Sequence, residues 1–401
     1  MKNIEALIAF GSIALLVTTA PAAEMSGPGY TASEILLGNI MPYSGPASSY
    51  SVIGKTEAAY FDMINERGGI NGRKIKFISY DDGYSPPKAI EQARRLVESD
   101  NVLALFQPLG TPSNAAIQKY MNTKKVPQLF VATGASRFSD PANFPWTLGF
   151  NPKYETETRV YAKYILAGKP DAKIAVIYQN DDSGRDQVRG LEEGLGEKAA
   201  SMIISRASYE TTDVVVDSQI VKLRASGADV LVSLGTPRAG SQTIRKVAEI
   251  GWKPALFFVG NPQSSVAGVL EPAGLENSKG IISSSFIKDP VDPTWKDDPE
   301  TAQYKQFMER YNSATSWTNS NAAYGYVAAQ LMVHVLEKCG DDLSRDNLLK
   351  QATSVENFKP AFILPGISMN TSATNYSPVK QLQLIQFDGA SWRLHGPVIS
   401  E

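Results

Sequence analysis

The sequence is poor in the residues that carry most enzymatic and metal chemistry. Its 401 residues include one cysteine, Cys339, and two histidines, His334 and His395. A single cysteine excludes an internal disulfide, and no His, Cys and Asp residues occur at the spacing of a metal site. His334 lies in an apolar helical stretch and His395 near the last strand, where structural roles are more frequent than catalytic ones. We therefore expect neither a metal ion nor another cofactor.

The motifs of common enzyme classes are also missing. No serine lies in a G-x-S-x-G elbow, and no Walker or G-x-G-x-x-G loop follows a strand. Adjacent carboxylates occur at Asp81-Asp82 and Asp181-Asp182. Neighbouring side chains of a strand face opposite ways, so these pairs are more typical of capping residues than of an acid/base dyad. We predict that the protein is not an enzyme.

Neither net charge nor hydrophobicity is extreme. The formal net charge is -2, hydrophobic residues make up 43% and charged residues 20% of the chain. This composition is typical of a globular protein, and without a basic excess we expect no nucleic-acid partner. No segment after residue 22 approaches the roughly 20 apolar residues of a membrane helix.

The first 22 residues have the pattern of a signal peptide. Lys2 precedes the largely apolar run Leu7–Val17, and the small residues Ala20-Pro21-Ala22 follow. The alternatives are a buried helix or a membrane anchor, but the run is short for a bilayer. No cysteine lies near the cleavage site to carry a lipid. We expect a soluble periplasmic monomer without a membrane anchor.

Apolar runs of strand length alternate with helical patterns from residue 35 to residue 286. This alternation predicts parallel α/β sheets, and the number of units favours two lobes. Prolines and aromatic residues interrupt the pattern at 143–152, which marks the best break. The tail differs, because Gln381–Phe387 alternates in polarity and Asp388-Gly389 follows as a turn, which predicts a β-hairpin.

Two small polar loops follow neighbouring apolar runs. Gly110-Thr-Pro-Ser113 comes after the run 102–106, and Thr133-Gly-Ala-Ser136 after the run 126–131. Loops at the carboxyl ends of parallel strands form the crevice in which ligands bind, and a helix N-terminus suits a carboxylate. The alternative is that both hydroxyls only cap their own helices.

Several motifs in a fixed order resemble one family. They are Tyr43-Ser-Gly-Pro-Ala-Ser-Ser-Tyr50, Asn65-Glu-Arg-Gly-Gly-Ile-Asn-Gly72, Asp81-Asp82 and Lys88-Ala-Ile-Glu-Gln-Ala93. This set is similar to the periplasmic branched-chain amino acid-binding (Leu/Ile/Val-binding) family, the solute receptors of ABC importers, and the match extends over nearly all of the chain after residue 22.

The resemblance implies a fold and a partner. The expected fold is the type I periplasmic-binding-protein fold, with two lobes, each a parallel sheet flanked by helices, and three hinge crossovers. It places residues 33–149 and 280–355 in one lobe and residues 150–279 and 356–401 in the other. The expected partners are a small-molecule carboxylate, held between the lobes, and an ABC permease in the inner membrane.

The same resemblance gives the candidate ligand-binding residues. The loops at 110–113 and 133–136 would hold the ligand carboxylate, Tyr50 would line the cleft, and Ser183 matches a position where a tyrosine commonly meets the ligand. The full set is Tyr50, Leu109, Gly110, Thr111, Thr133, Gly134, Ala135, Ser136, Phe150, Ser183, Arg238, Asn261 and Tyr324.

One departure from the family pattern bears on the ligand. Amino-acid binders present an acidic residue in the loop that here reads Gly235-Thr-Pro-Arg-Ala-Gly-Ser241, without a carboxylate. A buried ammonium without an anion is costly, whereas Arg238 offers positive charge, unless it is only an exposed helix start. The run 127–138 with 144–146 resembles a subgroup associated with aromatic acids.

We therefore expect capture of a small organic acid, such as a benzoate or a hydroxycinnamate. Aromatic side chains such as Tyr50, Tyr84 and Phe150 could stack on its ring, or could equally belong to the core. The alternatives are binding of a branched-chain amino acid or amide and, from another class, a ligand-sensing partner of a receptor or a hydrolase on the same fold.

Overall fold

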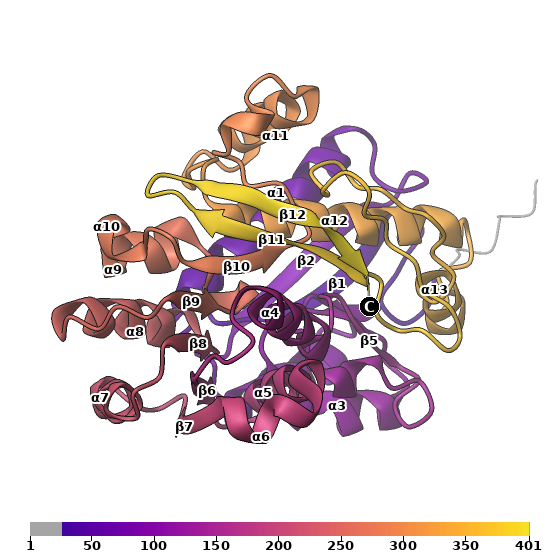
Figure 1. Ribbon diagram of the computed structural model, residues 1–401. Coiled ribbons are helices and arrows are strands. Elements are labelled where there is room, and N and C mark those ends of the chain that lie inside the picture. Colours follow the sequence, from indigo (N-terminus) through magenta and orange to yellow (C-terminus); the bar gives the residue numbers. More distant parts are fainter. Residues whose placement is uncertain (1–25, 401) are drawn as a thin grey trace, which may run out of the picture.

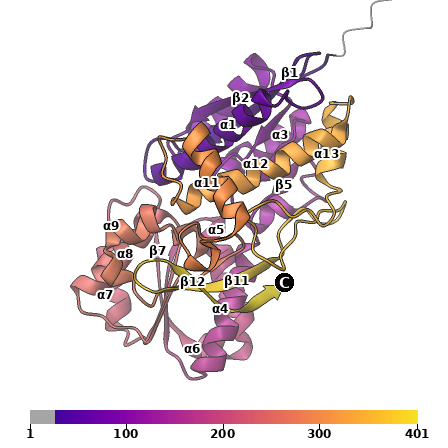
Figure 2. The same cartoon turned by 90° about the horizontal axis from the view of Figure 1, so that it is seen from above.

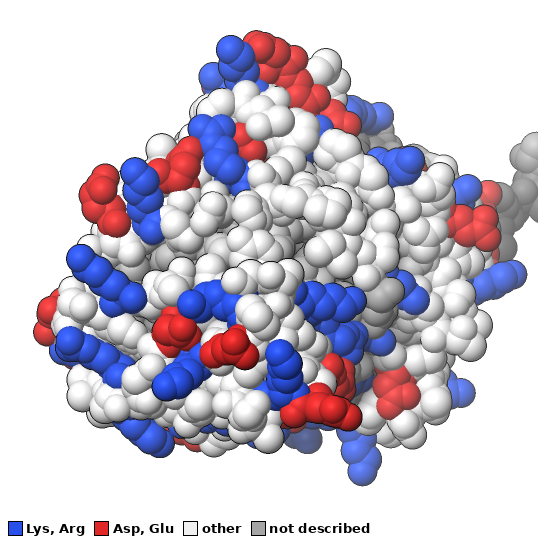
Figure 3. All heavy atoms as spheres, viewed as in Figure 1, with Lys and Arg blue, Asp and Glu red and all other residues white. Residues whose placement is uncertain are grey.

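The computed structural model describes residues 26–400, and the predicted signal peptide at 1–22 lies outside this range. The described chain forms two α/β lobes (Figures 1 and 2), so the expected fold class is confirmed. No helix in this range is long and apolar enough to cross a membrane. Lysine and arginine lie interspersed with aspartate and glutamate over the face drawn in Figure 3, which agrees with the small net charge.

Lobe 1 contains a five-stranded parallel sheet in the order β2-β1-β3-β4-β5. Its strands are β1 (Glu34–Met41), β2 (Lys74–Asp81), β3 (Ala104–Phe106), β4 (Gln128–Val131) and β5 (Thr147–Gly149). Its helices are α1 (Ser51–Glu66), α2 (Pro86–Arg94), α3 (Thr111–Lys124), α11 (Pro299–Tyr311), α12 (Ser320–Cys339) and α13 (Arg345–Ala352). Helix α12 is buried on most sides, as its apolar sequence predicts, and belongs to the main core of this lobe.

Lobe 2 contains a seven-stranded sheet in the order β12-β11-β10-β9-β8-β6-β7. Its strands are β6 (Ile174–Gln179), β7 (Ile203–Tyr209), β8 (Val230–Leu234), β9 (Leu256–Val259), β10 (Ile282–Ser285), β11 (Gln381–Phe387) and β12 (Trp392–Ser400). Its helices are α4 (Tyr154–Gly168), α5 (Asp182–Leu195), α6 (Ala199–Met202), α7 (Asp217–Ala225), α8 (Pro237–Glu249), α9 (Glu271–Ala273) and α10 (Leu275–Ser278). The expected terminal hairpin is present, because β11 pairs antiparallel with both β10 and β12.

The chain passes between the lobes three times. It leaves lobe 1 between β5 and α4, returns after β10, and enters lobe 2 again just before β11. In the view of Figure 2 the two lobes lie one above the other, with these connections between them. Three connections side by side form a hinge that lets the lobes rotate as bodies.

The observed lobe boundaries differ from the expected ones at two places. Strand β10 pairs with β9 and β11 in lobe 2, whereas residues 280–285 were expected in lobe 1. Residues Phe362, Leu364 and Met369 pack into the core of lobe 1, whereas residues 356–379 were expected in lobe 2. An apolar pattern predicts that a segment is buried, but it does not say which of two cores covers it.

Candidate functional site

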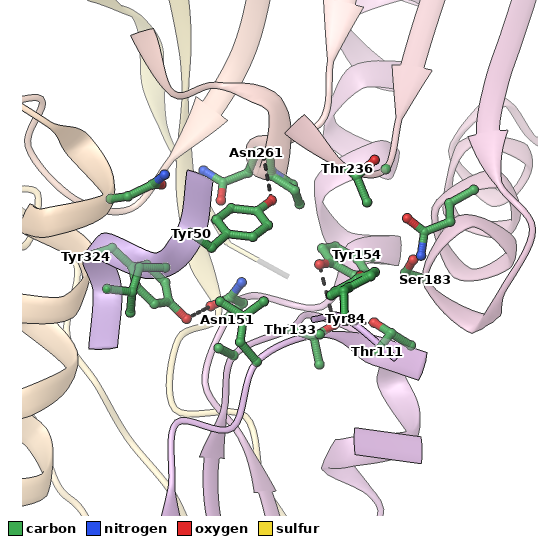
Figure 4. Close-up of a pocket in the computed structure, with 18 of the residues that line it drawn as sticks. Tyr50, Tyr84, Thr111, Thr133, Asn151, Tyr154, Ser183, Thr236, Asn261 and Tyr324 are labelled. Atoms are coloured by element: carbon green, nitrogen blue, oxygen red, sulfur yellow. Dashed lines mark hydrogen bonds between the residues drawn. The ribbon is translucent and has the colours of Figure 1, made fainter. Parts of the chain in front are cut away.

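A cavity lies between the two lobes, and side chains from both lobes line it (Figure 4). Its empty volume is about 650 Å³, which includes space open to solvent. The segments before β6 contribute Tyr50, Ile53, Tyr84, Leu109, Gly110, Thr111, Ala132, Thr133, Asn151 and Tyr154. The later segments contribute Gln179, Ser183, Gln187, Gly235, Thr236, Asn261, Pro262, Asn321 and Tyr324.

Lobe 1 presents hydroxyl groups where β3 and β4 end. The hydroxyls of Thr111 and Thr133 lie 2.6 Å apart, and Thr133 Oγ1 lies 3.4 Å from the Tyr154 hydroxyl. Thr111 is the first residue of α3, and Gly110 is the N-cap, with φ of 97°. The Thr111 hydroxyl therefore contacts the neighbouring loop rather than capping its own helix. This group of hydroxyls at a helix N-terminus suits an anion.

Gly110 is required by both its backbone and its surroundings. Its φ of 97° lies in a region that side chains rarely adopt. A Cβ atom there would come within 2.4 Å of the Tyr84 ring. A larger residue at 110 would displace an aromatic side chain of the cavity.

Lobe 2 presents amide and hydroxyl groups to the cavity, and hydrogen bonds to residues outside the lining hold these groups in place. The Asp181 carboxylate accepts hydrogen bonds from Ser183 Oγ and Gln179 Nε2, both at 2.5 Å, and caps α5 through Gly184 N–H. Thr236, the N-cap of α8, donates its backbone N–H to the Tyr209 hydroxyl at 2.8 Å. Neither carboxylate nor amine from this wall reaches the cavity surface among the described residues.

Four tyrosines give the cavity its aromatic surface: Tyr50, Tyr84, Tyr154 and Tyr324. Burial raises the pKa of Tyr154 to about 12 and raises the pKa of the other three well above the ordinary value. All four are therefore neutral hydrogen-bond donors at neutral pH. Tyr50 donates to the Pro262 carbonyl at 2.8 Å and Tyr324 to Asn151 Oδ1 at 2.7 Å.

Further contacts between the lobes lie at the edge of the cleft. The Ser136 backbone N–H and hydroxyl both donate to Asp186, at 2.8 and 3.0 Å. Arg137 forms an ion pair with Asp182 at 2.6 Å. Together with the hydrogen bond from Tyr50 to Pro262, these contacts bridge the two lobes.

A second cavity adjoins the first on the hinge side. Its empty volume is about 610 Å³, and it shares Asn261, Asn321 and Tyr324 with the first. It differs in charge, because Lys288 and Asp289 are among its lining residues. Lys288 is neutralised there by Asp298 and Glu300.

The structure brings eight of the predicted ligand-binding residues to the main cavity. These are Tyr50, Leu109, Gly110, Thr111, Thr133, Ser183, Asn261 and Tyr324. Five others do not line it: Gly134, Ala135, Ser136, Phe150 and Arg238.

For each of these five residues, the structure shows why it does not line the cavity. The Gly134 carbonyl accepts the Tyr154 N–H, and Ala135 packs into a small core. Ser136 contacts Asp186 at the cleft edge. Phe150 is fully buried with its ring against Tyr324, so it supports the cavity wall from behind. Arg238 is exposed and donates to the Val214 carbonyl, as the alternative of an exposed helix start implies.

Sequence reasoning missed several lining residues. Tyr154 begins α4, Thr236 follows β8, and Gln179 ends β6, so each lies at a strand end or a helix start, where a signal was available. Asn321 is the second residue of α12 and so also lies at a helix start, whereas Gln187 lies within α5 and carries no such signal. Among residues 26–400, no group of three or more His, Cys, Asp or Glu could hold a metal ion.

Comparisons with known proteins agree on a family. Residues 34–391 match the family model described as periplasmic binding protein. The "Leu/Ile/Val-binding protein homolog 7" of Brucella suis biovar 1 (strain 1330) is 24% identical over 86% of this chain and 88% of that protein.

Solved structures are similar over nearly the whole chain. A branched chain amino acid ABC transporter protein from Thermus thermophilus with bound valine has a TM-score of 0.80 at 15% identity, covering 92% of this chain and 96% of that chain. A fatty acid ABC transporter substrate-binding protein from Thermomonospora curvata has a TM-score of 0.78 at 20% identity, covering 95% and 96%. At these identities the structures show a shared fold, while their ligands differ in kind.

Proposed function

This chain belongs to the periplasmic binding protein family, and on that premise we propose that it captures a small aromatic carboxylate, such as a benzoate or a hydroxycinnamate, for an ABC importer. The observation that carries the proposal is the chemistry of the main cavity. Among the described residues, its lining includes no Asp, Glu, Lys, Arg or His, and it includes four tyrosines.

The absence of a carboxylate at the cavity surface weighs against an α-amino acid. An ammonium group enclosed there would lose its water without gaining an anion, which costs several kcal/mol per ion. The carboxylates that contact lining residues, Asp181 at Ser183 and Glu157 at Asn261, are already used as hydrogen-bond acceptors by the protein itself. A ligand without an ammonium group avoids this cost.

The carboxylate of the ligand would bind where the Thr111 and Thr133 hydroxyls of lobe 1 meet the Tyr154 hydroxyl of lobe 2. Thr111, Thr133 and Tyr154 can each donate a hydrogen bond, and α3 directs its N-terminus to the same place. Hydrogen bonds to an ionised acceptor are roughly twice as strong as neutral ones. The tyrosine rings would cover the apolar part of the ligand, where offset or edge contacts between rings are favourable.

Capture would couple to movement of the lobes. A ligand that contacts Thr111 on lobe 1 and Ser183 on lobe 2 makes its full set of contacts only when the lobes meet. Such a ligand shifts the population toward the closed form by the difference in its affinity for the two forms. The closed form would then be presented to a permease in the membrane.

Calorimetric titration with a panel of acids tests the proposal. The panel contains benzoate, 4-hydroxycinnamate, leucine, valine and hexanoate, with Thr111→Val as the variant. We expect the aromatic acids to bind tightly to the wild type, and at about 100 times Kd to raise the unfolding free energy by about 2.7 kcal/mol. We expect Thr111→Val to bind them more weakly while keeping its thermal stability.

Two outcomes would contradict this proposal. Binding of leucine or valine without binding of aromatic acids would support the amino-acid alternative, and turnover of a bound acid, followed by chromatography, would support an enzyme.

A further inference from the structure

Gln187 differs from the other amide side chains that line the main cavity. It projects from the middle of α5, its side chain is almost fully buried at 1% exposure, and it contributes to the cavity wall. Neither its Oε1 nor its Nε2 makes a hydrogen bond with any residue of the described chain.

The other lining amides all have partners. Gln179 donates to Asp181, Asn151 accepts from Tyr324, and Asn261 donates to the Ser284 carbonyl. Asn321 donates to the Ser49 carbonyl at 3.4 Å. A buried amide without partners costs about 1–3 kcal/mol. Gln187 thus carries unused hydrogen-bonding capacity in the wall of the main cavity.

The position of this amide is fixed by its neighbours. Its Nε2 lies against Gly260, where an added Cβ would come within 2.9 Å of it. Gln187 also lies beside Glu157, whose pKa is raised by burial and lowered in part by the Gln187 amide. These two neighbours place the amide between Gly260 and Glu157.

We propose that Gln187 recognises a hydroxyl substituent of the ligand and so selects hydroxylated aromatic acids over their unsubstituted parents. The inference rests on the proposed function and names the ligand class more closely. Thr111 and Thr133, which would bind the carboxylate, come from lobe 1, whereas Gln187 comes from lobe 2. An acid held at Thr111 can therefore extend toward lobe 2, where Gln187 lines the same cavity.

A hydroxyl fits this position better than other substituents. It can donate to Oε1 and accept from Nε2, whereas a methyl or a hydrogen atom leaves both amide atoms unpaired. A second carboxylate would lie beside the Glu157 carboxyl, which is an unfavourable neighbour for another negative charge. Sites built to hydrogen-bond a hydroxyl discriminate strongly against the analogue that lacks it.

The experiment compares two pairs of acids on three forms of the full chain. The pairs are benzoate with 4-hydroxybenzoate and cinnamate with 4-hydroxycinnamate, and Kd is measured by calorimetry. The proteins are the wild type, Gln187→Met, and Gln242→Met as a matched control on α8, whose side chain contacts the Val214 carbonyl outside the cavity. Thermal unfolding of each protein checks that it is folded.

We expect the wild type and Gln242→Met to prefer the hydroxylated member of at least one pair by about 10-fold or more. We expect Gln187→Met to reduce this preference to less than about 3-fold, by weakening the hydroxylated acid and leaving the parent acid nearly unchanged.

The possible failures are distinguishable. Equal binding of both members by the wild type would overturn this inference alone, because water would then satisfy Gln187. The same holds if Gln187→Met keeps the preference. Should the variant fail to fold, the preference of the wild type decides. If the wild type binds none of the four acids, the proposed function is wrong and this inference falls with it.

Discussion

Two buried glutamates lie near the main cavity, one in each lobe, and their surroundings differ. Glu157, on α4 of lobe 2, is 3% exposed, and its Oε1 accepts hydrogen bonds from Asn261 N–H, Tyr161 OH and Ser284 OH at 2.6–2.7 Å. Glu57, on α1 of lobe 1, is fully buried, and neither of its carboxylate oxygens makes a hydrogen bond within the described chain. Burial raises the pKa of both groups.

The difference separates a structural acceptor from a buried acid without partners. Glu157 joins α4, the loop after β9 and strand β10, and so fixes Asn261 at the cavity. Glu57 lies one turn after Ile53, which lines the cavity, and its nearest titratable neighbours include Tyr43 and Tyr324. Burial alone therefore does not tell whether a carboxyl stabilises or destabilises the folded protein. That depends on whether the carboxyl has hydrogen-bond partners.

The largest expected effect comes from replacing each glutamate with leucine. Glu157→Leu should lower the free energy of unfolding by about 3 kcal/mol or more, because the Asn261 N–H and the Ser284 hydroxyl lose their acceptor and Tyr161 loses one of two. Glu57→Leu should change it by less than about 1 kcal/mol or raise it, because a desolvated acid without partners is removed. Urea unfolding of both variants measures the difference. Equal losses would remove the distinction between the two sites.

The pH dependence of stability gives the next largest effect. Because the pKa of Glu57 is raised in the folded state, the folded protein keeps a proton that the unfolded chain releases above about pH 4.3. The contribution of Glu57 to the free energy of unfolding is therefore complete below that pH, and it is lost as the pH rises toward the pKa of the folded state.

Glu57→Gln should remove this loss, so its advantage over the wild type should grow as pH rises from 5 to 7. Urea unfolding at a series of pH values measures the advantage. A constant advantage would mean that Glu57 titrates alike in both states.

Shortening only one of the two glutamates, Glu157, should weaken ligand binding. Glu157→Asp shortens the side chain by one methylene, so it should release Asn261 and weaken 4-hydroxybenzoate binding by about 10-fold. Glu57→Asp should stay within about 2-fold of the wild type, because Glu57 is not among the residues that line the cavity. Calorimetry measures both, and similar weakening in the two variants would place Glu57 in the binding machinery.

The smallest effect is expected from a single hydroxyl beside Glu157. Ser284→Ala removes one of three donors and should cost about 1 kcal/mol of unfolding free energy. Ser233 is its matched control, because it is also buried on a strand of lobe 2 and its hydroxyl makes no hydrogen bond among the described residues. Ser233→Ala should cost less than about 0.5 kcal/mol. A larger loss at Ser233 would show that hydrogen bonding does not explain the comparison.

Much of the fold followed from local pattern. The alternation of apolar runs with helical periodicity predicts the βα units, because a strand and a helix bury different repeats of side chains. The tail pattern predicts the hairpin of β11 and β12 in the same way. The pattern could not assign residues 282–285 and 356–379 to the correct lobe, because the cores of both lobes accept apolar side chains.

The candidate site, like the fold, could be predicted only in part. The loops at strand ends that carry Thr111 and Thr133, and the lack of a carboxylate in the loop 235–241, could be predicted because both depend on residue order alone. Which side chains of those loops face the cavity became known only from the folded chain.

Arg238 and Gln187 illustrate the physical reason. Arg238 lies three residues after Gly235 but turns to the surface, while Gln187, inside a helix, turns to the cavity. The direction of a side chain depends on helix phase and on partners from other segments, such as Val214 beside Arg238 and Gly260 beside Gln187. Those partners lie far away in the sequence and meet only when the chain has folded.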